Sequence, residues 1–295
     1  MAGGAVRRAC VIGGSGFLGS HVCDQLSAAG FAVTILDRVP SRWRRADQHM
    51  MTADLLDVAA LEEAVAGCEA VYNFAAIADI DEALSRAVDT VRVNILGHVH
   101  ALEACRTHGV ERYVYASTVY VHSREGGFYR CSKFAAEQYV EEYSRVYGLP
   151  YTVLRYGSLY GPRSDHHNGL RRIVRRALET GTVSYEGSVE AMRQYIHVED
   201  AARASVAALS EDFRNQHVVL TGQEPMRVMD LLKMLSEILG LSHDVEFIET
   251  DRPGHYVRTP YAYQPRLGRK YVPPLHVDLG QGLLELIDDI KRELV

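Results

Sequence analysis

The sequence predicts an α/β protein with a doubly wound parallel sheet and a smaller mixed region toward the C-terminus. Two observations predict this fold. Short apolar runs alternate with helix-like segments through the first 156 residues, and this alternation is typical of parallel sheets. A glycine-rich turn joins the first of these runs to the first helix, which is where a dinucleotide-binding sheet has one. A chain of 295 residues is long enough for one large domain or two unequal ones.

The elements are expected in a regular order. Residues 8–14 form the first strand, because they are a short apolar run that ends in glycines. Residues 17–30 form the first helix, because apolar residues recur there at helical spacing and the segment closes on a glycine. The same two patterns then alternate. Further strands are expected over 32–38, 70–76, 110–118 and 150–158, and further helices over 56–68, 83–109 and 130–148.

Composition and charge exclude several classes of protein. A net charge of −6 disfavours a general nucleic-acid binder, and the arginine runs at 42–45 and 171–176 are interpreted as solvated faces. No run of about 18 apolar residues suggests a membrane span, and residues 1–14 are too glycine-rich for a signal peptide. The five cysteines form no C-x-x-C pair, so we expect reduced thiols in a cytoplasmic protein. The histidines, among them His166 and His167 in a loop, lack zinc spacing, so we expect no metal site.

The first turn has the residues that a dinucleotide site requires. Gly13, Gly16 and Gly19 allow a tight turn and a close approach of the backbone to a pyrophosphate at the start of a helix. Asp37 ends the second strand, where a carboxylate binds ribose hydroxyls and repels a 2′-phosphate. This favours NAD over NADP, although the next residue, Arg38, could hold a phosphate instead. Asp54 and Leu55 lie where a loop could meet the adenine edge.

Glycine and proline become frequent after Arg155, and the pattern loses its regularity. We therefore expect residues 1–156 to form an NAD-binding Rossmann domain. Residues 157–295 are expected to be mainly a substrate-binding region, interleaved with the last strands and helices of the first domain.

A tyrosine and a lysine share one helix face beyond the fourth main strand. Tyr129 and Lys133 are separated by one helical turn. Ser117 and Thr118 end the preceding strand, at the edge where ligands of open sheets bind. An ammonium group and a positive nicotinamide ring both favour the phenolate, so Tyr129 is expected to act as general base and acid. Thr118 can hydrogen-bond the same substrate oxygen.

An ordered set of motifs accompanies these residues. It comprises GGSGFLG, LDR, ADLLD, NFAA, VN at 93–94, AST, YRCSK, LRYGSLYGPR, RQYIHVEDAARA and DRPGH. With this set the chain resembles the extended short-chain dehydrogenase/reductases, in particular the nucleotide-sugar epimerases and dehydratases. The resemblance covers nearly the whole chain and implies NAD as cofactor and a nucleotide-diphosphate sugar as substrate.

The resemblance also implies roles for individual residues. The catalytic residues would be Thr118, Tyr129 and Lys133. The cofactor would contact Gly13, Gly16, Phe17, Leu18, Asp37 or Arg38, Asp54, Leu55, Ala75, Ala76, Asn94, Lys133 and Tyr156. The substrate would contact Ser117, Thr118, Tyr129, Ser158, Arg193 and Arg252, and the two arginines would grip the diphosphate.

The chain departs from the family pattern in its substrate pocket. Asn73 stands where the family often has histidine, and Ser158 where it often has asparagine. Only residues 121–128 separate Tyr120 from Tyr129, a shorter segment than usual. Dehydratases and decarboxylases usually carry carboxylates beside the catalytic threonine, whereas Val119 and Tyr120 follow Thr118 here.

These departures favour an epimerase acting at carbon 4 of the sugar. Another redox enzyme of nucleotide sugars (a reductase, dehydrogenase, decarboxylase or dehydratase) and a non-catalytic nicotinamide-binding regulator remain as alternatives. The apolar faces at 96–105 and 134–147 correspond to helices that form a four-helix bundle in such families, which predicts a homodimer.

Overall fold

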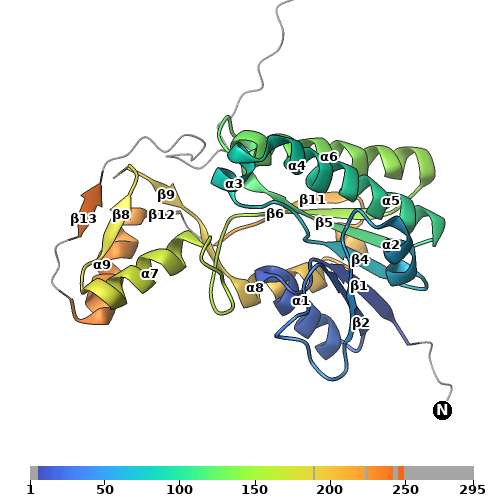
Figure 1. Cartoon of the computed structure of the whole chain (residues 1–295), viewed down its shortest axis with the longest axis horizontal. Coiled ribbons are helices and arrows are strands. Elements are labelled where there is room, and N and C mark those ends of the chain that lie inside the picture. The colour runs from blue at the N-terminus through green and yellow to red at the C-terminus, as the bar shows by residue number, and fades with distance from the viewer. Residues whose placement is uncertain (1–5, 189, 223–224, 242–244, 249–295) are drawn as a thin grey trace, which may run out of the picture. The chain divides into compact units, whose positions relative to one another are not determined.

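A seven-stranded sheet, parallel between every pair of neighbours, carries the site. The computed structural model describes residues 6–188, 190–222, 225–241 and 245–248. The strand order is β11-β6-β5-β4-β1-β2-β3, so the chain changes direction across the sheet between β1 and β4 (Figure 1). Ligands of such sheets bind beyond the carboxyl ends of the strands at this switch point. The strands are β1 (Arg8–Ile12), β2 (Ala32–Asp37), β3 (His49–Thr52), β4 (Ala70–Asn73), β5 (Arg112–Thr118), β6 (Tyr151–Tyr156) and β11 (Gln216–Leu220).

Helices cover both faces of this sheet (Figure 1). On one face, α2 (Val58–Val65), α5 (His98–Thr107) and α6 (Gly127–Tyr147) bury residues such as Leu61, Leu102 and Val140 in one apolar cluster. On the other face, α1 (Phe17–Ala28) and α8 (Val198–Ala207) bury Val22 and Ala201 in a second cluster. The predicted doubly wound α/β fold is therefore confirmed.

The structure differs from the sequence prediction in two places within this domain. The short edge strand β3 was not predicted, because four residues with no β-branched run give little signal. The single helix expected over 83–109 is instead α3 (Ile80–Ser85), α4 (Ala87–Val91), the π-helical turn η1 (Arg92–Gly97) and α5. The helix breaks at Arg86, whose backbone leaves the helical region (φ −128°, ψ 50°).

Smaller elements follow β6. Three two-stranded sheets pair β7 (Ser158–Tyr160) with β10 (Tyr195–His197), β9 (Met192–Arg193) with β12 (Met226–Arg227), and β8 (Ser184–Glu186) with β13 (Glu246–Ile248). Two amphipathic helices, α7 (Gly169–Thr180) and α9 (Val228–Leu239), contribute Ala177 and Leu232 to a third apolar cluster. The short helical turns η2 (Val119–His122) and η3 (Glu211–Phe213) complete the described elements. Among the described residues, no helix is both long and apolar enough to cross a lipid bilayer.

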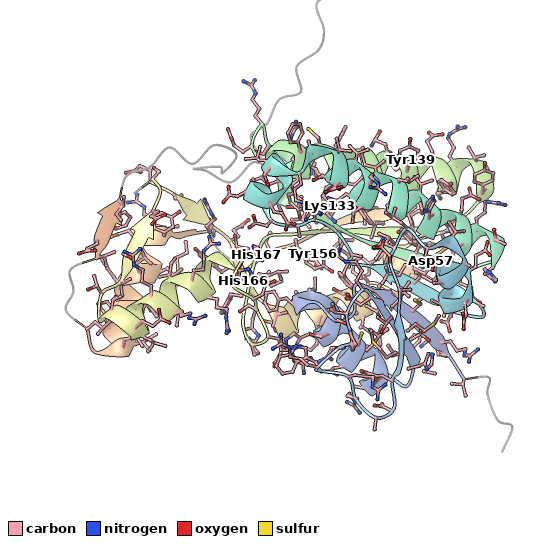
Figure 2. All side chains as sticks on the ribbon, in the orientation of Figure 1. Asp57, Lys133, Tyr139, Tyr156, His166 and His167 are labelled. Atoms are coloured by element: carbon pink, nitrogen blue, oxygen red, sulfur yellow. The ribbon has the colours of Figure 1, made fainter. Side chains whose placement is uncertain are left out.

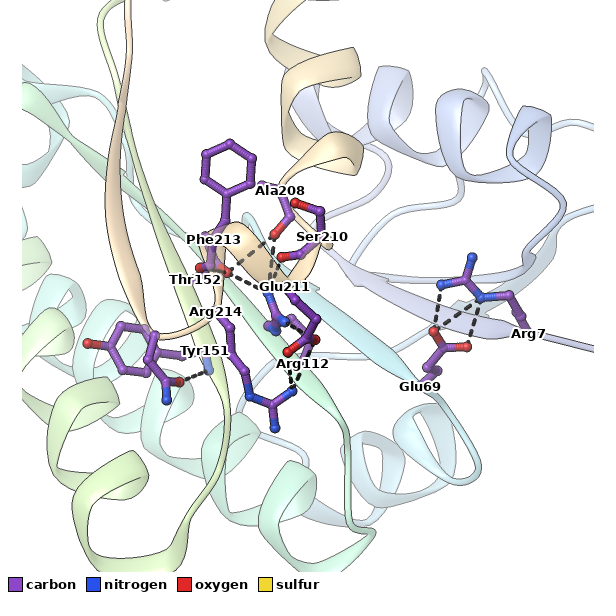
Figure 3. A network of polar contacts seen from close by, with 11 residues as sticks. Arg7, Glu69, Arg112, Tyr151, Thr152, Ala208, Ser210, Glu211, Phe213 and Arg214 are labelled. Atoms are coloured by element: carbon purple, nitrogen blue, oxygen red, sulfur yellow. Dashed lines mark hydrogen bonds and ion pairs between the residues drawn. The ribbon is translucent and has the colours of Figure 1, made fainter.

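The buried Arg112 ties the sheet to the segment that leads into its last strand (Figure 3). Its Nη1 donates to Thr152 Oγ1 at 3.1 Å and to the Ala208 carbonyl at 3.3 Å. Its Nη2 donates to Glu211 Oε1 at 3.0 Å. These bonds join β5 and β6 to the end of α8, and β11 then pairs with β6. A segment that follows the smaller elements β7 to β10 in sequence thus completes the sheet.

Candidate active site

The first turn leaves room for a phosphate group between β1 and α1. Gly13 adopts a left-handed conformation (φ 81°), and a Cβ there would lie 2.6 Å from the Ala75 nitrogen. Only glycine therefore fits where the turn passes the end of β4. Gly16 precedes α1 and offers no side-chain cap, so the first N–H groups of the helix are available to an anion. The geometry fits the pyrophosphate of a dinucleotide.

Asp37 is held beside this turn. Its carboxylate accepts hydrogen bonds from the Ser15 nitrogen at 3.0 Å and from the Val39 nitrogen at 3.2 Å. The Ser15 hydroxyl donates to the Val39 carbonyl at 2.7 Å, which closes the loop around the carboxylate. Arg38 is exposed. This arrangement presents an acceptor for ribose hydroxyls at the end of β2.

Asp54 and Leu55 occupy the loop that follows β3. The Asp54 carboxylate accepts from the Leu56 nitrogen at 2.9 Å. Leu55 is buried, and its side chain packs so closely on Gly97 that a Cβ there would lie 2.7 Å from Leu55 Cγ. Leu55 thus connects this loop to the π-helical turn η1.

Two buried asparagines hold the backbone of the segment that follows β4. Asn73 Oδ1 accepts from the Ala75 nitrogen at 3.1 Å, and its Nδ2 donates to the Tyr113 hydroxyl at 3.0 Å. Asn94 lies in η1 and binds both the nitrogen and the carbonyl of Ile77, at 2.8 and 3.0 Å. Its Nδ2 also donates to Ser132 Oγ at 2.9 Å. The π turn therefore brings a buried amide between the 75–77 segment and α6.

Tyr129 and Lys133 face the end of β5 from one side of α6. Thr118, the last residue of β5, is buried and lines the same cavity as Tyr129. Lys133 Nζ donates to the Ala116 carbonyl at 2.7 Å and lies 4.8 Å from the centre of the Tyr115 ring. Figure 2 labels Lys133 on α6 and Tyr156 at the end of β6. The three predicted catalytic side chains therefore meet at one point.

Burial dominates the electrostatics of this point. It raises the pKa of Tyr129 to about 12, which the Thr118 hydrogen bond partly opposes. Burial also lowers the pKa of Lys133 to about 7, against the attraction of Glu137. The sequence prediction considered the positive charges near Tyr129 but not its burial. In the protein without nucleotide, the phenol is thus held in its neutral form.

One cavity of about 740 Å³ connects these groups to the later elements. The predicted site residues that line it are Gly13, Gly16, Phe17, Leu18, Ala76, Ser117, Thr118, Tyr129, Lys133, Tyr156, Ser158 and Arg193. The predicted residues Asp37, Arg38, Asp54, Leu55, Ala75 and Asn94 do not line it, and Arg252 lies outside the described residues. The Tyr156 hydroxyl is bonded to Ser205 Oγ at 2.6 Å.

The cavity also has residues that sequence reasoning missed or left open. His167, which the sequence analysis placed in a loop without a role at the site, lines it, and its Nδ1 lies 3.7 Å from Asp79 Oδ2. Asp79 caps α3 by accepting from the Glu82 nitrogen at 2.8 Å, and Asp81 lines the cavity as well. Glu137 on α6 does not line the cavity but is buried one helical turn from Lys133. It was also missed, although its spacing of four residues from Lys133 was a visible signal.

Comparison with known proteins gives a consistent result. Residues 9–221 match the profile of the "NAD dependent epimerase/dehydratase family". The chain is 25% identical over 304 residues to a putative UDP-glucose 4-epimerase of Methanocaldococcus jannaschii, with 96% of this chain and 98% of that protein covered. It is 25% identical over 319 residues to the dTDP-glucose 4,6-dehydratase of Streptomyces niveus, with 95% and 92% covered. The crystal structure of Thermotoga maritima UDP-glucose 4-epimerase with UDP-glucose has a TM-score of 0.78 at 27% identity, with 84% and 87% covered.

Proposed function

Because the chain belongs to the NAD-dependent epimerase/dehydratase family of nucleotide-sugar enzymes, we propose that it is a nucleotide-sugar epimerase acting at carbon 4. The observation that carries this proposal is the cavity around Thr118, Tyr129 and Lys133. The residues that follow Thr118 there are Val119, which is buried, and Tyr120. Neither offers the carboxylate that a dehydration beside Thr118 requires, whereas epimerisation requires only a reversible oxidation.

Each catalytic residue has a distinct task in this reaction. Tyr129, as the phenolate, accepts the proton of the sugar hydroxyl. It returns this proton after the keto sugar has rotated in the pocket. Thr118 hydrogen-bonds the same oxygen, and Lys133 provides a positive charge that favours the phenolate. The glycine turn at Gly13 and Gly16 and the Asp37 carboxylate would hold NAD, which would supply a hydride acceptor for carbon 4 and then a hydride donor for the opposite face of the keto sugar. A large cavity supports the proposal, because the keto sugar has to rotate between the two half-reactions.

The nucleotide diphosphate is proposed to bind on the side of the cavity formed after β6. Arg193 on β9 lines this side, and a guanidinium is well suited to phosphate oxygens. Ser158 on β7, which pairs with Tyr195 on β10, lines the same cavity. We assign Arg252 the same task as Arg193. In this proposal residues 1–156 mainly bind NAD and residues 157–295 mainly bind the substrate.

A homodimer through a four-helix bundle is also part of the proposal. The outer faces of α4, η1 and α6 leave large apolar side chains exposed, more than a solvated helix pair usually does. They are Val88, Val91, Leu96, Phe134, Tyr139 and Val146. Two copies of this face would bury them around a twofold axis. The five cysteines are free thiols, which supports a cytoplasmic location.

The experiment that tests the function uses the protein as purified, without added NAD. UDP- and dTDP-sugars are incubated with it, and products are separated by chromatography and identified by NMR. We expect a mixture of two sugars that differ at carbon 4, with no net change in absorbance at 340 nm. A 4-keto-6-deoxy product would instead identify a dehydratase, and a requirement for stoichiometric NAD would identify a dehydrogenase or reductase.

A further inference from the structure

A buried network of charged and polar side chains lies behind the catalytic end of β5, and the proposed reaction does not use it. At its centre is Glu137, one helical turn after Lys133 on α6, with a side chain only 1% exposed. Its carboxylate accepts from the Ser117 hydroxyl and from Arg155, at 3.0 Å from Nε and 2.6 Å from Nη2. Ser117 directly precedes Thr118. Glu137 therefore connects the lysine helix to the strand that ends in the catalytic threonine.

The Arg155 guanidinium on β6 keeps this carboxylate ionised. His122 Nε2 lies 2.9 Å from Arg155 Nη1, and His217 Nδ1 lies 2.9 Å from Nη2. Because arginine only donates, both ring nitrogens act as acceptors. Burial alone would raise the pKa of Glu137, but the hydrogen bonds from Arg155 and Ser117 lower it. Glu137 is therefore negatively charged at every pH at which the enzyme is expected to work.

Stability alone does not explain why a charge pair stands here. A buried ion pair often adds little compared with apolar residues of the same size. The position of Glu137 relative to Lys133 says more about its role, because residues four apart on a helix are neighbours. The ammonium is buried and faces Tyr115 on β5, Tyr129 on its own helix and the neutral His98 on α5. None of these three side chains is negatively charged. The negative charge that favours the Lys133 ammonium is that of Glu137.

We propose that Glu137 is a positioning residue of the catalytic centre, which keeps the Lys133 ammonium charged and anchors the Ser117–Thr118 end of β5 to α6. This inference rests on the proposed function, in which Lys133 acts as a cation. Without the carboxylate, the buried amine would lose its proton at a lower pH, so that a smaller fraction of Lys133 would be charged near neutral pH. The strand end that holds Thr118 would also lose its bond to the helix that holds Tyr129.

The lysine content of the chain allows a direct test that needs no substrate. The sequence contains four lysines, Lys133, Lys233, Lys270 and Lys291, so selective ¹³C labelling gives four ε-methylene signals in an NMR titration. Lys133→Met identifies the signal of Lys133. We expect a pKa of about 7 for Lys133 and a value lower by about one pH unit or more in Glu137→Gln, as loss of a nearby opposite charge implies.

A matched control removes a carboxylate from the same helix. Glu142→Gln, at an exposed position, should leave the titration of Lys133 unchanged. An unchanged Lys133 titration in Glu137→Gln would overturn the proposal. If Glu137→Gln does not fold, the double variant Glu137→Gln, Arg155→Met removes both buried charges and avoids an unpaired one.

The double variant also separates positioning from a purely structural role. We expect it to melt within a few degrees of the wild type and to keep a Lys133 pKa below the wild-type value, by less than in Glu137→Gln because the opposing Arg155 charge is also removed. The alkaline limb of kcat should move to lower pH by the same amount. If Lys133 titrates in a stable double variant as it does in the wild type, the Glu137–Arg155 pair has only a structural role. A wild type inactive on every nucleotide sugar would contradict the proposed function, while the NMR titration would still decide the role of Glu137.

Discussion

The Lys133 ammonium lies 5.9 Å from the centre of the Tyr129 ring, one helical turn along α6. Both groups are shielded from water, which favours the neutral form of each. Burial raises the pKa of the tyrosine to about 12 and lowers that of the lysine to about 7. A proton therefore leaves Tyr129 easily only when further positive charge is near, which links the chemistry to the bound, oxidised nicotinamide.

Replacing Tyr129 with phenylalanine removes the proton acceptor and keeps the ring. We expect kcat to fall by at least about a hundredfold, the usual contribution of a general acid–base group, with NAD affinity and melting temperature unchanged. Turnover is measured by product NMR, and NAD binding by calorimetry. Near-wild-type turnover would exclude Tyr129 as the general base.

Arg193→Ala should weaken substrate binding and leave cofactor binding intact. A charge-assisted hydrogen bond contributes about 1.5–3 kcal/mol, so the KM for the nucleotide sugar should rise roughly ten- to a hundredfold. Inhibition by free nucleoside diphosphate should weaken equally. Arg175→Ala on α7, at an exposed position paired with Glu179, is the control. Unchanged inhibition in Arg193→Ala would place the diphosphate elsewhere.

The buried His98 should make the protein sensitive to mild acid. Its Nδ1 accepts from the Tyr113 hydroxyl at 3.0 Å, its Nε2 faces the Ala136 carbonyl at 3.1 Å, and burial together with the Lys133 charge lowers its pKa to about 3. The unfolded chain binds a proton below a pH of about 6.5, whereas the folded protein does not until about pH 3. The stability contributed by neutral His98 is thus complete above pH 6.5 and decreases as the pH falls toward 3.

The expected loss at pH 5 is about 2 kcal/mol from this group. In His98→Gln, whose amide offers an acceptor and a donor, the free energy of unfolding should depend less on pH between 7 and 5 by that amount. Urea unfolding at several pH values measures it. The exposed His108→Gln should behave as the wild type, and an equal pH dependence in His98→Gln would contradict the assignment.

Phe134→Glu should dissociate the proposed dimer, because it places a charge within the apolar face of α6. Phe134 is 49% exposed in the single chain. Light scattering at micromolar concentration should give the mass of two chains for the wild type and of one chain for the variant. Leu178→Glu on α7, at a similarly exposed apolar residue, should remain dimeric. A monomeric wild type would contradict the proposed assembly.

The sequence predicted the parts of the fold that depend on local pattern. Strand and helix periodicity located β1, α1, β2 and α6, because neighbours in the chain determine those patterns. The π turn around Asn94 is accompanied instead by contacts with Ile77 and Ser132, which periodicity does not reveal.

The same distinction applies to the site. Motif spacing was sufficient to select Gly13, Thr118, Tyr129 and Lys133 as site residues, and all four line one cavity. Glu137 was missed because its partners Ser117, Arg155 and His217 come from three separate strands. The burial of Tyr129, which raises its pKa to about 12, was not predicted because burial is a property of the folded chain.

The pairing of β11 with β6 has a consequence for the folding of the chain during its synthesis on the ribosome. Residues 151–156 are made early, but the strand that pairs with them on that side, Gln216–Leu220, is made about sixty residues later. At a translation rate of about 5–20 residues per second, the open side of β6 stays unpaired for several seconds. Unpaired strand edges attract other chains. The nascent chain should therefore depend on chaperones during this interval, and a gene truncated after residue 156 should yield insoluble protein.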